Sequence, residues 1–159
     1  MRKEKTITLN DRGNELTFKI REMPAMKLQG WLFRAALILL RGVSTNNNGD
    51  LVNDAIKLVG EQGIAAFRNV NYEEAKPLLN ELLECCSRLD GNVSVKLTAD
   101  VVDGMIEDVR TLFALEQEAA AINLSFLKAA EPSSTREETQ KAAAETTSKP
   151  RILIRSPHS

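Results

Sequence analysis

The sequence predicts a mainly α-helical fold with a small β element, in which an N-terminal β-hairpin and an optional third short strand pack on a bundle of about four helices. Two segments near the N-terminus alternate polar and apolar residues, as half-buried strands do. Four later segments repeat apolar residues at helical spacing. Aromatic residues make up 4% of a chain that is 43% hydrophobic, which favours aliphatic packing between helices.

Composition divides the chain into a helical domain over residues 1–130 and a flexible tail over residues 131–159. From Glu131 onward the residues are small, polar or charged, and no apolar residue larger than alanine occurs before Ile152. Such a segment cannot bury enough surface to offset the entropy of ordering it. We therefore expect disorder over residues 131–150.

The predicted hairpin consists of the alternating segments 6–9 and 15–21, joined by residues 10–14, which tolerate left-handed backbone angles. A hairpin alone is marginally stable, so its apolar face needs a helix to cover it. The residues on that face are Ile7, Leu9, Leu16, Phe18 and Ile20.

A first helix is predicted from Pro24 to Arg41, because Pro suits a first turn and apolar residues then recur at helical spacing. Trp31 and Phe33 are interpreted as core residues of this helix. A polar run rich in Asn and Gly follows it and ends it.

A second helix opens at Leu51 with Asp50 as its N-cap, and Gly60 and Gly63 are expected to weaken or break it. A short apolar segment over residues 64–67 follows.

A third helix is predicted over residues 72–89, with Asn71 as its cap and Cys86 on its apolar stripe. Residues 93–97 alternate like a short strand that extends the sheet of the hairpin.

Thr98 is predicted to cap the last and longest helix, which finishes near Ala130. Its acidic residues are interpreted as a solvated face near the positive end of the helix dipole: Asp100, Asp103, Glu107 and Asp108. Its apolar residues form two groups: first Val101, Val102, Met105, Ile106, Val109, Leu112 and Phe113, and then Ile122, Leu124, Phe126 and Leu127.

The residues that most enzymes need are scarce, so we predict no catalytic, cofactor-binding or metal site. The single histidine, His158, is next to last in the chain, where no neighbour holds it as a base. Cys85 and Cys86 are adjacent, which suits neither a structural disulfide nor a zinc site, and we expect reduced, inert thiols. No glycine-rich phosphate loop with its lysine occurs.

Charge and hydropathy argue against nucleic acid and membrane as partners. The formal net charge is −1, so the chain lacks a basic footprint for phosphates. The longest apolar stretch, residues 31–40, is shorter than the roughly 20 residues that cross a bilayer, and the N-terminus does not resemble a signal peptide. We expect a cytoplasmic protein.

Two apolar segments exceed what a small domain needs and are candidate partner-binding sites. One comprises Ile122, Leu124, Phe126 and Leu127, for which burial in the core is the competing interpretation. The other comprises Ile152, Leu153 and Ile154, which either dock on a partner or belong to an inert tail.

The order of these segments resembles tail assembly chaperones of long-tailed bacteriophages over about residues 5–128. The resemblance lies in the hairpin of residues 5–13, in residues 18–25, in Leu97-Thr98 and residues 106–112, and above all in residues 122–127. The last segment, Ile-Asn-Leu-Ser-Phe-Leu, is similar to the Leu-Asn-Phe-x-Phe-Phe type of ending of the folded part in that family.

The resemblance implies a protein of the bacterial host cytoplasm that binds the tape measure protein, keeps it soluble and helps recruit tail tube subunits. It also implies absence from the finished virion and, in many members, a longer form made by translational frameshifting. Homo-oligomers are compatible with this role. The alternatives are a structural virion component such as a tail completion protein, and a small helical regulator that binds nucleic acid.

Overall fold

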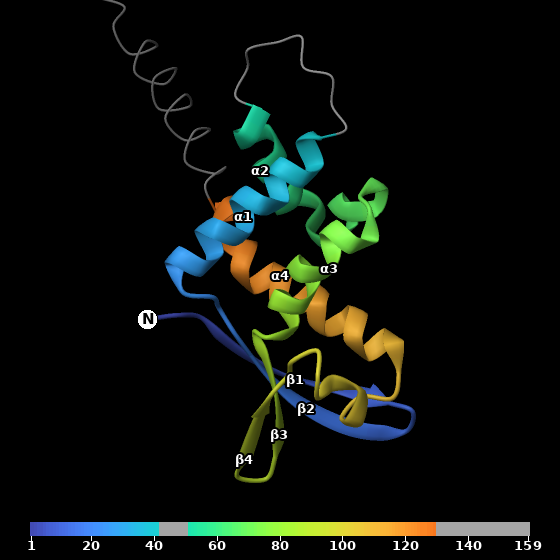
Figure 1. Ribbon diagram of the computed structural model, residues 1–159. Helices are drawn as coiled ribbons and strands as arrows, with labels where there is room; N and C mark the ends of the chain where they lie inside the picture. The colour runs from blue at the N-terminus through green and yellow to red at the C-terminus, as the bar shows by residue number, and fades with distance from the viewer. Residues whose placement is uncertain (42–50, 130–159) are drawn as a thin grey trace, which may run out of the picture. The chain divides into compact units, whose positions relative to one another are not determined.

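A computed structural model describes residues 1–41 and 51–129 (Figure 1). These residues contain four α-helices, two short 3-10 helices and four strands. In Figure 1 the sheet lies at one end and most of the helices at the other, while α4 runs diagonally from the sheet to α1. The predicted class, mainly α with a small β element, is confirmed. The predicted tail lies outside the described residues, so its disorder stays a prediction.

The N-terminal hairpin forms as predicted. Strand β1 (Glu4–Asp11) pairs with β2 (Asn14–Arg21) in antiparallel register from Glu4 opposite Arg21 to Asp11 opposite Asn14. The two residues left between the strands, Arg12 and Gly13, both have positive φ, at 49° and 95°. Two such residues make the type of turn whose twist matches that of paired strands. Phe18 and Ile20 on the inner face are fully buried.

Two further strands complete a sheet of order β1-β2-β3-β4. Strand β3 (Cys86–Asp90) pairs with the free edge of β2, and β4 (Val93–Lys96) pairs with β3. The predicted strand over residues 93–97 therefore exists over Val93–Lys96 and extends the sheet of the hairpin as predicted, with β3 lying between β4 and the hairpin.

The prediction of a helix over residues 72–89 is wrong in its last third. Helix α3 (Tyr72–Leu83) begins at the predicted cap, where the Asn71 side chain accepts a hydrogen bond from the Glu73 amide at 3.1 Å. The helix stops early because the backbone groups of Cys86–Asp90 form hydrogen bonds with β2 instead of continuing the helix. Cys86 is fully buried as predicted, although it lies on a strand and not on a helix.

Helix α1 (Ala25–Leu40) matches its prediction, and Trp31 is the centre of its packing. The indole Nε1 donates a hydrogen bond to the Leu78 carbonyl oxygen at 3.0 Å, and its ring meets Phe67 edge-on with centroids 6.2 Å apart. Phe33, predicted to be a core residue, is instead 47% exposed. It lies on the side of α1 that faces away from Trp31.

Helix α2 (Leu51–Gln62) passes through Gly60 without a break, so of the two predicted effects of this glycine only a weakening of the helix stays a prediction. Gly60 is buried, and a Cβ atom at that position would lie 2.8 Å from Leu127 Cδ1. The glycine thus allows close packing of α2 against α4. Gly63, with φ of +57°, does end the helix, and a 3-10 helix follows over Gly63–Asn69. The predicted cap, Asp50, lies outside the described residues.

Helix α4 (Val109–Ala129) begins later than predicted, because Thr98 does not cap it. Residues 98–108 form turns and a 3-10 helix over Val102–Gly104. The predicted first apolar face is correspondingly split, since Val102 and Ile106 are buried while Val101, Val109 and Phe113 are exposed.

The side chain of Asp11 sets the start of α4. Its two carboxylate oxygens accept hydrogen bonds from the amides of Glu107 and Asp108, both at 2.8 Å, and from the Thr111 hydroxyl at 2.9 Å. Burial alone would raise the pKa of Asp11, but these hydrogen bonds outweigh it and hold the pKa below its ordinary value. The end of the hairpin thereby fixes the first turn of the last helix.

We expect Asp11→Ala to lower the free energy of unfolding by about 3 kcal/mol, because it leaves two amides and a hydroxyl without their buried acceptor. Urea denaturation followed by circular dichroism measures the change. Asp103→Ala, at an exposed acidic residue of the 3-10 turn, is the matched control and should change stability by less than about 0.5 kcal/mol. Equal effects of the two substitutions would contradict the anchoring role of Asp11.

A second prediction concerns the contact between Gly60 and Leu127. Gly60→Val should destabilise the fold by about 2 kcal/mol because the new side chain overlaps Leu127. Leu127→Ala should relieve part of that cost, so the double variant should be more stable than the sum of the single effects predicts. Additive effects in the same denaturation experiment would show that the two residues do not touch.

Candidate protein-interaction surface

The predicted partner-binding segment of α4 is largely part of the core. Leu124 is 2% exposed, and Ile122 and Leu127 are partly buried against the core. Phe126, at 43% exposed, is the member of this segment whose ring is most open to solvent. The other predicted segment, Ile152, Leu153 and Ile154, lies outside the described residues, and its docking role stays a prediction.

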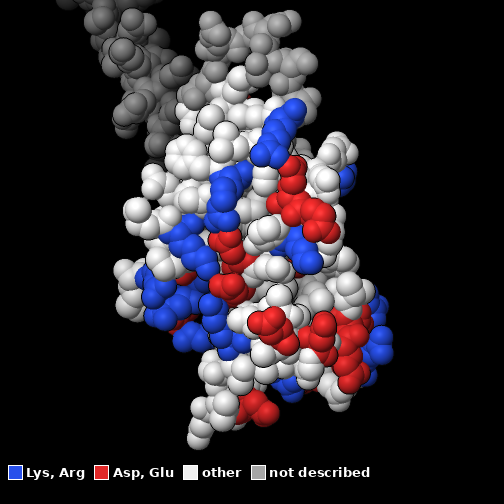
Figure 2. Space-filling model, viewed as in Figure 1, with Lys and Arg blue, Asp and Glu red and all other residues white. Residues whose placement is uncertain are grey.

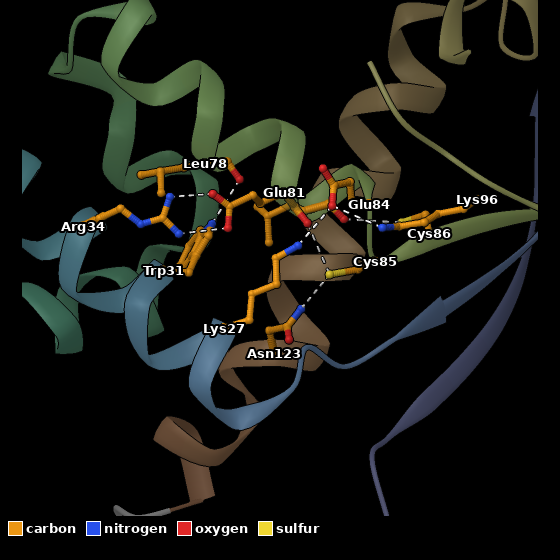
Figure 3. Close-up of polar contacts among 11 residues, drawn as sticks. Lys27, Trp31, Arg34, Leu78, Glu81, Glu84, Cys85, Cys86, Lys96 and Asn123 are labelled. Atoms are coloured by element: carbon orange, nitrogen blue, oxygen red, sulfur yellow. Dashed lines mark hydrogen bonds and ion pairs between the residues drawn. The ribbon is translucent and has the colours of Figure 1, made fainter. Parts of the chain in front are cut away.

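Asn123, within the same segment, has a structural role that the sequence reading missed. Its side chain is 1% exposed, accepts a hydrogen bond from the Met23 amide at 2.7 Å and donates one to the Ala119 carbonyl oxygen at 2.8 Å. Its amide nitrogen also lies 3.6 Å from the Cys85 sulfur (Figure 3). Asn123 thus ties α4 to the connection between β2 and α1. A polar residue inside an apolar run was the available signal.

Ion pairs join α1 to α3 along one edge. Basic residues recur every seventh position on α1, and acidic residues of α3 or its C-terminal end face them (Figures 2 and 3). Arg34 holds Glu81 through two hydrogen bonds of 2.5 and 2.9 Å, and planar pairs of this kind are geometrically specific. The other pairs are Lys27 with Glu84 at 3.0 Å, and Arg41 with Glu74.

Glu84 also accepts a hydrogen bond from Lys96 of β4 at 3.2 Å, so one carboxylate links α1 and the sheet (Figure 3). Its pKa is lowered, first by the hydrogen bond from Lys27 and then by the one from Lys96. The basic row on α1 is therefore largely neutralised within the molecule, and it offers little free positive charge to a ligand.

The two cysteine thiols are expected to be unreactive. Cys85 and Cys86 are both free, and burial raises the pKa of each, that of Cys86 to about 12. A thiol with so high a pKa is protonated at neutral pH and is a poor nucleophile. The structure places both side chains in packing and hydrogen-bonding roles.

The acidic residues predicted to share a helix face do not share one. Asp100 and Asp103 are exposed residues of the turns before α4, and Asp108 instead caps that helix through the Arg110 amide at 2.9 Å. The hydrogen bond from the Arg110 side chain lowers the pKa of Asp108 to about 2. Among residues 1–41 and 51–129, no group of three or more His, Cys, Asp or Glu side chains is arranged to hold a metal ion.

A groove of about 370 Å³ lies between α2, the 3-10 helix after it and α4. Gly60, Ile64, Phe113, Leu124 and Lys128 are among its lining residues. Its apolar lining suits contact with another apolar surface. None of the helices in the described part of the chain has the length and apolar character that a bilayer crossing requires.

Large apolar side chains remain exposed on the outer faces of two helices. Exposure of this kind on a soluble domain is typical of contact surfaces when the residues lie together on one face. The exposed residues are Met26, Phe33 and Leu37 on α1, and Val109, Phe113 and Phe126 on α4.

Comparison with known protein families, characterised proteins and solved structures finds no match to this chain.

Glu116 on α4 is a buried acid that affects stability. Glu116 is 7% exposed, and burial raises the pKa of its carboxyl group from an ordinary value of 4.5 to about 7. The folded state therefore favours the protonated form. The energetic penalty of its charge is absent below pH 4.5, grows between pH 4.5 and about 7, and is complete above that pH.

We expect Glu116→Gln to stabilise the protein relative to the wild type by about 2 to 3 kcal/mol at pH 8, and to have little effect at pH 4.5. Urea denaturation at a series of pH values measures this difference. Gln117→Ala, at the exposed neighbouring position, removes no titrating group and should give a difference that does not vary with pH. A flat profile for Glu116→Gln would mean that the carboxyl group is not buried.

Proposed function

We propose that this chain is a tail assembly chaperone of a long-tailed bacteriophage, which binds the tape measure protein, keeps it soluble and helps recruit tail tube subunits. The observation that carries the proposal is the set of apolar side chains exposed on the outer faces of α1 and α4. The sequence resemblance over residues 5–128 supplies the identity of the partner.

The chemistry of the described residues supports a binding role over a catalytic one. The two thiols are partly or fully buried and have raised pKa values, and the carboxylates with lowered pKa values are used as helix caps or ion-pair partners. These groups stabilise the fold, and Asp11 and Asp108 line two different pockets.

Exposed apolar side chains suit the proposed client. A tape measure protein is a long chain with apolar helical stripes that self-associate unless they are covered. A chaperone must cover them with modest affinity, because tube subunits later displace it. Contacts spread over single exposed side chains on a rigid helix provide such affinity, since the cost of association offsets much of the gain from burial.

The alternative function, that of a structural virion component, differs from the chaperone function in the final location of the protein. A chaperone acts in the host cytoplasm and is absent from the finished particle, whereas a tail completion protein is incorporated. The alternative as a nucleic-acid-binding regulator is disfavoured by the formal net charge of −1.

Co-expression tests the chaperone role directly. The tape measure protein of the same genome should be recovered in the soluble fraction together with this chain, and should be mostly insoluble when it is expressed alone or with an unrelated helical protein of similar size. Recovery that does not depend on this chain would refute the role.

The predicted contact segments can be tested in the same assay. A chain that ends at Ala130 and carries Phe126→Gln removes both the exposed ring and the apolar tip of the tail. We expect it to keep less of the client soluble than the full chain does. An unchanged soluble yield would exclude both segments as the main contact, and mass spectrometry of purified particles then distinguishes a chaperone from a virion component.

A further inference from the structure

The outer face of α1 carries an apolar stripe that the core does not use. Met26, Phe33 and Leu37 are 80%, 47% and 57% exposed. With Gly30 and the half-buried Leu40 they recur at spacings of four and three residues along α1. We call these five residues the outer α1 stripe.

A second apolar face on one helix is unusual for a small soluble domain. The inner face of α1 already packs on the core through Leu28, Trp31, Leu32 and Ala35. An amphipathic surface helix normally places polar residues opposite its buried face. In α1 the outer α1 stripe occupies that position, so the helix presents apolar side chains to solvent across about four turns.

Gly30, in the middle of this stripe, leaves room for a partner to approach. It lies inside α1, where glycine costs about 1 kcal/mol relative to alanine, and its φ is not in the left-handed region. A Cβ atom at Gly30 would meet nothing within 4 Å. Neither the backbone nor the packing of the described residues therefore requires a glycine here. A small residue does permit a partner backbone to approach closely.

The charge along the stripe indicates what kind of partner fits. Lys27, Arg34 and Arg41 border one edge, and each is paired with a glutamate at α3. Gln29, on the other edge, is exposed and uncharged, and Ala36 farther along that side is fully buried in the core. Figure 2 shows the basic row beside acidic groups, with uncharged surface on its other side. The contact is therefore matched to an apolar partner surface of low net charge.

We propose that the outer α1 stripe is the docking site for one amphipathic α-helix of the client, with apolar residues at the same alternating four- and three-residue spacing. Side chains at this spacing interlock with those of a second helix that has the same repeat. The assignment rests on the proposed chaperone function, and it names the surface and the class of segment through which that function acts.

A second copy of this chain fits the stripe less well. From Met26 to Leu40 the stripe is about 21 Å long, at about 1.5 Å per residue. A pair of helices of that length buries less than the roughly 800 Å² per partner of a standard stable interface. Such a contact suits a reversible encounter that is repeated along a long client.

The test replaces Phe33 and Leu37 together by Gln in the full chain, and co-expresses it with the tape measure protein of the same genome. We expect about a tenfold fall in the client that co-purifies, as loss of one central contact residue typically gives. Tyr72→Gln, which removes an exposed aromatic ring from the first residue of α3, outside the exposed faces of α1 and α4, is the matched control and should leave recovery unchanged. Thermal unfolding verifies that each variant is folded.

Gly30→Gln separates docking from stability. Gln is a better helix former than glycine, so the free protein should unfold at a higher temperature, while client recovery should fall because the side chain fills the point of closest approach. A variant that is more stable and still recovers the client as well as wild type overturns the proposal.

The remaining outcomes are also decisive. If wild type keeps the client soluble and the Phe33 and Leu37 variant does so equally, the docking site is wrong and the chaperone function stands. If wild type fails to keep the client soluble, both are wrong. If sedimentation shows a dimer that the Phe33 and Leu37 variant loses, a second copy occupies the stripe and the proposed occupant is wrong.

Discussion

Two buried polar side chains hold α4 across the sheet, and the remaining architecture depends on them. Asp11 accepts hydrogen bonds from the amides of Glu107 and Asp108, just before the helix. Asn123, near the other end of the helix, accepts one from the Met23 amide. Apolar burial between these points is strong but has no direction, so it does not fix how far the helix slides or turns. The hydrogen bonds do fix it, because an amide left without its acceptor in the interior is costly. They therefore fix α4 relative to the hairpin and to the segment that leads into α1.

The sequence predicted those elements whose pattern is local. The alternation that ends in Phe18 and Ile20 and the helical repeat around Trp31 identify β2 and α1 by themselves. Residues 86–90 and 98–108 were assigned wrongly because their structure is decided by distant partners. Residues from Cys86 onward form a strand because they pair with the free edge of β2. Helix α4 begins only at Val109 because Asp11 binds the amides of the residues before it. The local spacing of apolar residues reveals neither the edge of β2 nor Asp11 as a partner.

The interaction surface was harder to predict for a related reason. An apolar run shows that a helix contacts something, but it does not show which side meets the protein's own core. Leu124 therefore proved to be internal, while Phe33, which had been interpreted as core, proved to be external. The distinction depends on how helices are placed in three dimensions. Gly30 was the overlooked clue, since a glycine without a conformational reason within a helix calls for another explanation.

The long reach of the two anchors affects how the polypeptide matures during translation. Asp11 to Thr111 and Met23 to Asn123 each join residues 100 positions apart. The hairpin leaves the ribosome early, but its apolar face stays exposed to solvent until the final helix emerges. A nascent chain must therefore wait in an aggregation-prone state, and the charged residues at the start of the edge strand β1, Glu4 and Lys5, help to keep that edge from pairing with other chains in that interval.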